Sequence, residues 1–192
     1  MDSLWALEIV AVSMGLIFII LLISENIWCW AFGILSSLAF VFLMYYRRLY
    51  SESILYVFYV IIGVYGWQKW SQEGENKIVI HRVSWRAIAT VLILGAVLSY
   101  LAGYYFNNYT NAQRPFADAT SSVFSILASY MEAHKWLSSW VFWIVINGFS
   151  IWLYFDRSLN FSSFLMVIYL LLSIFGFIQW RQRYIYQSQV SQ

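Results

Sequence analysis

The residues His134 to Ser150 read HKWLSSWVFWIVINGFS and combine three tryptophans with a primary amide at helical spacing. The four side chains, separated by steps of four, three and four, are Trp136, Trp140, Trp143 and Asn147. At about 100° per residue these steps place them on one face of a helix. Indoles stack on flat rings and attract cations, and an amide hydrogen-bonds polar substituents. The pattern predicts a site for a flat, polar ring compound that can carry a positive charge, with Trp140, Trp143 and Asn147 as contacts.

A second row of polar side chains lies in FADATSSVFSILASYMEAHK, residues 116–135. Its members recur at helical spacing and are Asp118, Ser122, Ser125, Ser129 and Glu132. Polar groups in a membrane span almost always face the protein interior or a water-filled cavity. We therefore add Asp118, Ser122 and Ser125 to the predicted site. Two alternatives remain open, because serine rows also pack helices together and an aspartate after Pro115 suits a helix cap.

The run from Ile54 to Trp70 contributes aromatic side chains next to glycines that permit close approach. Tyr59 is the member that we add to the predicted site. Other tryptophans near the ends of apolar runs are typical of interfacial belts, and Trp136 belongs with them. Glu8 and Glu132 also lie near such ends, where carboxylates can reach the lipid headgroups.

Composition shows which solvent these elements face. Of 192 residues, 62% are hydrophobic, 21% aromatic and 10% charged, whereas a soluble domain carries about 25% charged residues. A bilayer must therefore cover most of the chain.

The net charge of +2, without a basic run, gives no reason to expect nucleic-acid binding. One cysteine, Cys29, excludes an intrachain disulfide. HExxH and GxSxG motifs are absent and both histidines lie in or beside loops, so we expect no enzyme activity, metal or cofactor.

Apolar runs of about 20 residues predict an all-α membrane protein with seven spans and no separate soluble domain. The spans are Leu4–Ile23, Ile27–Tyr46, Ile54–Trp70, Ala87–Phe106, Ala117–Ala133, Leu137–Phe155 and Ser162–Trp180. Seven positive side chains lie on the side of the C-terminus and four on the side of the N-terminus. The positive-inside rule then predicts a cytoplasmic C-terminus.

A shift of 110 residues reveals an internal repeat. Between Trp30 and Trp70, twelve of 41 positions match their partners without a gap. The matches include Trp30 with Trp140 and Trp70 with Trp180. Residues 4–70 and 117–180 are therefore predicted to be parallel repeats within one transmembrane domain of residues 1–192, joined by an inverting helix over 87–106. Such repeats are typical of transporters that bind substrate between their halves.

Several segments of the chain resemble the Pnu family of bacterial vitamin transporters. They are ENIWCWAFG, YGWQKW, RPFADATSSVFSILASYMEAHKW, WVFWIVINGFSIWLY and IFGFIQW, in an order that extends over nearly the whole chain. The W-x-x-W feature of the family falls on Trp140 and Trp143, and its PF-x-D element ends at Asp118. Ser138 stands where the family often has a glutamate.

The resemblance implies a 3+1+3 fold related to the sugar-transporting SWEET proteins, located in the bacterial inner membrane. It implies facilitated diffusion of a vitamin, with a cytoplasmic kinase trapping the product, and it allows a homo-oligomer. Nicotinamide riboside is the expected substrate. Thiamine is the alternative, because NIWCW and Glu52 are similar to thiamine-associated members. A seven-helix small-molecule receptor is the alternative from another class.

Overall fold

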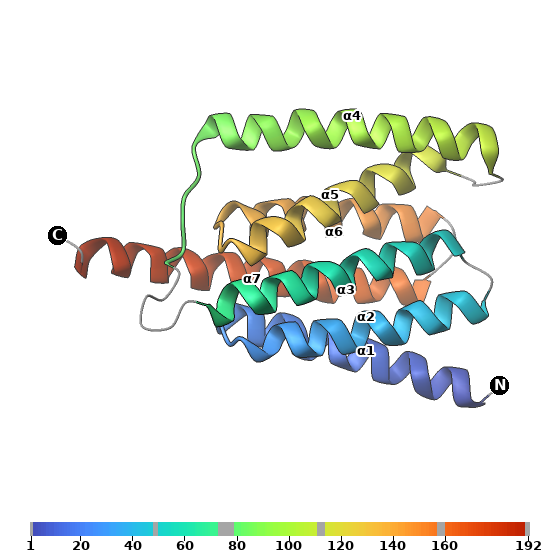
Figure 1. The fold of residues 1–192 in the computed structure, drawn as a ribbon, viewed down its shortest axis with the longest axis horizontal. Helices are drawn as coiled ribbons and strands as arrows, with labels where there is room; N and C mark the ends of the chain where they lie inside the picture. Colours follow the sequence, from blue (N-terminus) through green and yellow to red (C-terminus); the bar gives the residue numbers. More distant parts are fainter. Residues whose placement is uncertain (1, 48–49, 73–78, 111–113, 157–159, 191–192) are drawn as a thin grey trace. The chain divides into compact units, whose positions relative to one another are not determined.

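The computed structural model describes residues 2–47, 50–72, 79–110, 114–156 and 160–190. Within them the chain forms seven α-helices and no sheet (Figure 1). The helices are α1 (Asp2–Ile23), α2 (Trp28–Tyr46), α3 (Tyr50–Ser71), α4 (Trp85–Tyr109), α5 (Pro115–Ala133), α6 (Ser138–Asp156) and α7 (Asn160–Val190). The predicted all-α fold with seven helices is confirmed. By length and composition α1, α2, α4, α6 and α7 could each cross a membrane.

The chain divides into two compact units, Met1–Ile78 and Val79–Gln192, and each is described by itself. In the first, α2 contacts both α1 and α3. In the second, α6 contacts both α5 and α7, and α4 packs along α5 (Figure 1). The order of contacts in the first unit is therefore repeated in α5–α7, with α4 added to the second unit. The division into repeats and a linker helix, with bounds 4–70, 87–106 and 117–180, remains a prediction.

The core of the first unit is built on a tryptophan that packs against a glycine. The indole of Trp30 lies over Gly66, where a Cβ atom would come within 2.5 Å of the ring. Trp30 also meets the ring of Trp70 edge-on, with centroids 5.5 Å apart. Only glycine leaves room for this ring, because α2 and α3 approach each other closely here.

The second unit contains the same arrangement 110 residues later. The indole of Trp140 lies over Gly176, where a Cβ atom would come within 2.4 Å of the ring, and it meets Trp180 edge-on at 5.4 Å. Trp140 and Trp180 are both completely buried. The matched residues of the two segments therefore occupy equivalent positions in three dimensions as well as in sequence.

The corner between α1 and α2 has the same backbone geometry as the corner between α5 and α6. In the first unit Glu25 adopts a φ of 57°, its N–H donates to the carbonyl of Leu22 at 3.0 Å, and the N–H of Asn26 donates to Leu21 at 3.0 Å. These are the two hydrogen bonds of a Schellman motif. The same pair of bonds recurs around Lys135, whose φ is 51°. Both corners thus place a residue with a side chain in the left-handed conformation.

We expect glycine at position 25 to stabilise the first corner. A left-handed conformation costs a residue with a Cβ atom about 1 kcal/mol that glycine avoids. Glu25→Gly should therefore have a free energy of unfolding about 1 kcal/mol higher than Glu25→Ala, which removes the same side-chain contacts and keeps the strain. Denaturation of the purified protein in detergent would measure this difference. Equal stability of the two variants would contradict the strain.

Helix α4 packs on α5 through small residues. Gly95, Ser99 and Gly103, spaced four apart, are the buried residues of α4. A Cβ atom at Gly95 would come within 2.5 Å of the Phe124 ring, and one at Gly103 within 2.4 Å of Phe116. This is the close packing that small residues permit between membrane helices. It positions α5, and with it the polar row that α5 carries.

Candidate functional site

The predicted site residues of the second unit lie on α5 and α6, and α6 is the helix that contacts both α5 and α7. Two rows of side chains run along α6, each with a spacing of seven residues. Trp140 and Asn147 contact α7, and Trp143 and Ser150 are directed to α5. Residues seven apart return to nearly the same side of a helix, and a step of three rotates the direction by about 60°. The single face predicted from the sequence is thus divided between two neighbouring helices.

Trp140 belongs to the row directed to α7. Its side chain is fully buried between Gly176 and Trp180, and its indole N–H has no hydrogen-bond partner among the described residues. These contacts give Trp140 a structural role equivalent to that of Trp30. Its predicted contact with substrate stays a prediction.

Asn147 is the second member of this row. It is 6% exposed, and its side-chain N–H donates to the hydroxyl of Ser173 on α7 at 3.1 Å. Ser173 in turn donates to the carbonyl of Tyr169 at 2.7 Å. The positions 110 residues earlier hold Ser37 and Gly63, so the first repeat has no counterpart of this pair. The amide is therefore a polar feature that distinguishes the second repeat.

Trp143 and Glu132 form the polar contact between α6 and the end of α5. Glu132 is 2% exposed, and the indole N–H of Trp143 approaches its carboxyl group at a geometry short of a full hydrogen bond. One oxygen of Glu132 and the indole N–H lack a partner among the described residues. A buried carboxylate needs compensation from a cation or hydrogen bonds. This carboxyl group therefore does not reach the lipid headgroups, and it is suited to a cationic ligand.

A third polar contact lies further along α6. The hydroxyls of Ser121 on α5 and Ser150 on α6 are 3.4 Å apart, and Ser150 is 5% exposed. Together with Trp143–Glu132 and Asn147–Ser173, this makes three polar pairs along α6 from position 143 to position 150. At 1.5 Å per residue they extend over about 10 Å.

The other predicted site residues lie on α5 and on α3. Asp118 is half-buried in the first turn of α5, and its backbone N–H donates to the carbonyl of Arg114 at 3.0 Å. Ser122 is half-buried and Ser125 is 6% exposed, both on α5. Tyr59 lies in α3 of the other unit, with its ring 5.9 Å from that of Tyr56. The described residues therefore bring together α5 and α6 members, and Tyr59 is placed only within its own unit.

Sequence reasoning gave too little weight to Glu132, Ser150 and Ser173. Glu132 ends the polar row of α5, and its regular spacing was a usable signal. Ser150 lies seven residues after Trp143, which repeats the seven-residue spacing of Trp140 and Asn147. Ser173 carries no such signal, because its role depends on α7 lying against α6. No group of three or more His, Cys, Asp or Glu side chains comes together among the described residues.

Comparison with known protein families gives a match that extends over most of the chain. A family model described as nicotinamide mononucleotide transporter matches residues 5–182. The riboflavin/roseoflavin transporter RibM of Streptomyces davaonensis is 25% identical over 182 residues, which cover 92% of this chain and 84% of RibM. The nicotinamide riboside transporter PnuC of Escherichia coli is 27% identical over 177 residues, covering 78% of this chain and 74% of PnuC.

A solved structure shares the fold. The crystal structure of the vitamin B3 transporter PnuC superposes with a TM-score of 0.75 and 23% sequence identity, covering 93% of this chain and 81% of that chain. The likeness extends over nearly the whole chain and shows that the two proteins share a fold.

Proposed function

We propose that this chain, which belongs to the nicotinamide mononucleotide transporter family, carries nicotinamide riboside across the membrane by facilitated diffusion. It is a multi-pass membrane protein whose relatives are transporters. The observation that carries the proposal is the set of polar pairs along α6, above all the buried Glu132 carboxyl beside Trp143. Polar groups at such positions in a membrane helix are expensive and are typical of substrate pathways.

The chemistry of the pairs suits nicotinamide riboside. Its pyridinium ring is flat and positively charged, so it can stack on the Trp143 indole while the Glu132 carboxylate balances its charge. Its ribose hydroxyls can exchange hydrogen bonds with the amide of Asn147 and with Ser121 or Ser150. Ser122, Ser125 and Asp118 continue the polar surface on α5, and Tyr59 is the proposed contact from the first repeat. Trp140 supports this surface by holding α6 against α7.

Net uptake in this proposal needs no coupled ion. The substrate site opens alternately to the two sides of the membrane, as is general for transporters built from repeats. A cytoplasmic kinase then phosphorylates the riboside and keeps the inward gradient in place. The C-terminus lies in the cytoplasm, as the distribution of positive side chains indicates.

Riboflavin is a second candidate, favoured by the match to RibM over 92% of the chain. Its flavin ring is flat but neutral, so it would use the indole and the amide without needing the Glu132 carboxylate. Thiamine, whose thiazolium is a cation, would use the same groups as nicotinamide riboside.

Flux into proteoliposomes tests the proposal. Purified protein reconstituted without an ion gradient should equilibrate radiolabelled nicotinamide riboside faster than protein-free vesicles, and the substrate should quench tryptophan fluorescence. Thiamine and riboflavin should compete more weakly. Uptake of riboflavin or thiamine without uptake of nicotinamide riboside would contradict the proposed substrate and identify the other vitamin as the one transported. Binding without flux would indicate a receptor.

A further inference from the structure

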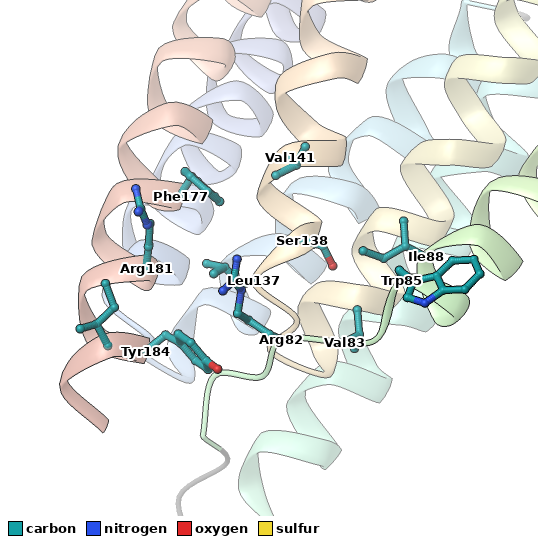
Figure 2. A pocket seen from close by; sticks show the side chains of 11 residues that line it. Arg82, Val83, Trp85, Ile88, Leu137, Ser138, Val141, Phe177, Arg181 and Tyr184 are labelled. Atoms are coloured by element: carbon teal, nitrogen blue, oxygen red, sulfur yellow. The ribbon is translucent and has the colours of Figure 1, made fainter. Parts of the chain in front are cut away.

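A pocket of about 540 Å³ lies in the second unit, away from the polar pairs of α6. It is bounded by the start of α6, the C-terminal half of α7 and the segment that leads into α4 (Figure 2). Its volume falls within the range of about 300–1,000 Å³ that is usual for small-molecule sites. The proposed transport does not use this pocket.

The polar part of the pocket is positive. Arg82 and Arg181 line it, and no acidic side chain does so among the residues that the structure describes. Tyr184 lies beside them, with the Arg82 guanidinium 5.9 Å from the centre of its ring. Ser138 also lines the pocket, and its buried hydroxyl has no hydrogen-bond partner among the described residues. Two guanidiniums and an unpaired hydroxyl suit a phosphate group, because arginine binds phosphate oxygens in a bidentate way.

The remaining wall is apolar. Phe177 lies on α7, four residues before Arg181, and Val141 lies on α6, three residues after Ser138 (Figure 2). Ile88 on α4 belongs to the same wall. All three helices are long and apolar enough to cross a membrane. Trp85, at the start of α4, is 74% exposed, which is typical of an aromatic residue at a membrane interface.

We propose that this pocket binds an anionic glycerophospholipid, with its phosphate between Arg82 and Arg181 and its acyl chains against Phe177 and Val141. The argument is charge complementarity joined to an apolar wall, which matches the two ends of a phospholipid. Basic pockets between membrane helices at the cytoplasmic side are known to bind such headgroups. The bound lipid joins α7 to the segment before α4.

Native mass spectrometry of the full-length protein with added phosphatidylglycerol tests the site. Each arginine near a membrane surface contributes about 1 kcal/mol, which is roughly fivefold in affinity. Arg181→Gln and Arg82→Gln should each weaken phosphatidylglycerol binding by about fivefold. Arg183→Gln is the matched control, because it removes the same charge from the same helix without lining the pocket, and it should stay within about twofold.

A second variant keeps the charge and fills the space. Val141 is 45% exposed, so Val141→Trp can fold and should displace the lipid without altering either arginine. Retained helicity by circular dichroism confirms folding in each case. Any of three results would overturn the proposal. These are an equal loss of lipid binding in Arg183→Gln, binding of phosphatidylcholine as tight as that of phosphatidylglycerol, and full lipid binding by Val141→Trp. Glycerol 3-phosphate competing at the concentration of the lipid would also overturn it, because it would assign the pocket to a soluble phosphate compound.

Discussion

Trp140→Ala is expected to destabilise the second unit by about 3–5 kcal/mol, the usual cost of deleting a large aromatic side chain from a well-packed core. The indole is fully buried and fills the space over Gly176 beside Trp180. Alanine would leave a cavity against a glycine, which has no side chain to close it. Urea or thermal denaturation in detergent, followed by circular dichroism, measures the loss.

The repeat supplies a matched control for this experiment. Trp30→Ala should cost a similar free energy, because Trp30 makes the same contacts with Gly66 and Trp70. Trp136→Ala should cost much less, because Trp136 is only half-buried at the corner before α6. A Trp140→Ala protein that keeps its stability and loses only substrate affinity would contradict the structural role and support the predicted contact of Trp140 with substrate.

The repeat was visible in the sequence because its matches fall on residues that pack together. Trp30, Gly66 and Trp70 recur as an intact set, and a ring that requires a glycine partner limits substitution at both positions. The helices were predictable for a related reason, since a bilayer requires long apolar runs. The end of α7 was not: it continues to Val190, ten residues past the predicted span, because its last three turns are polar and carry no hydropathy signal.

The sequence could not predict that the aromatic and polar side chains of α6 are shared between contacts with α5 and contacts with α7. Periodicity places Trp140, Trp143 and Asn147 on one face, but it does not say which neighbouring helix each one meets. The structure assigns Trp140 to a packing contact with α7 and turns Trp143 to Glu132 on α5. The position of Glu132 near the end of a predicted span suggests a carboxylate that reaches the lipid headgroups. Its burial follows from tertiary packing, where Met131 and Ala133 beside it are also completely buried.

Glu132→Gln is expected to lower the affinity for nicotinamide riboside at least thirtyfold. Removing one partner of a buried charge pair costs about 2 kcal/mol or more, and 2 kcal/mol corresponds to roughly thirtyfold in Kd. Glutamine keeps the size and hydrogen-bonding capacity of the side chain, so the fold should persist. Substrate titration by tryptophan fluorescence, with isothermal calorimetry as a second readout, measures the change.

Three comparisons make this expectation specific to the proposed site. Glu8→Gln removes a carboxylate that pairs with Arg47 in the first unit, and its Kd should stay within about twofold, as expected for an exposed ion pair. Trp143→Phe should retain more affinity than Trp143→Ala, because a phenyl ring still offers a π face to the pyridinium. Riboflavin, being neutral, should bind Glu132→Gln as well as it binds the unaltered protein. If Glu132→Gln binds nicotinamide riboside with unchanged affinity, the carboxylate is not part of the site. If the variant loses the same affinity for both vitamins, Glu132 supports the packing of α5 and α6 and does not contact the cation.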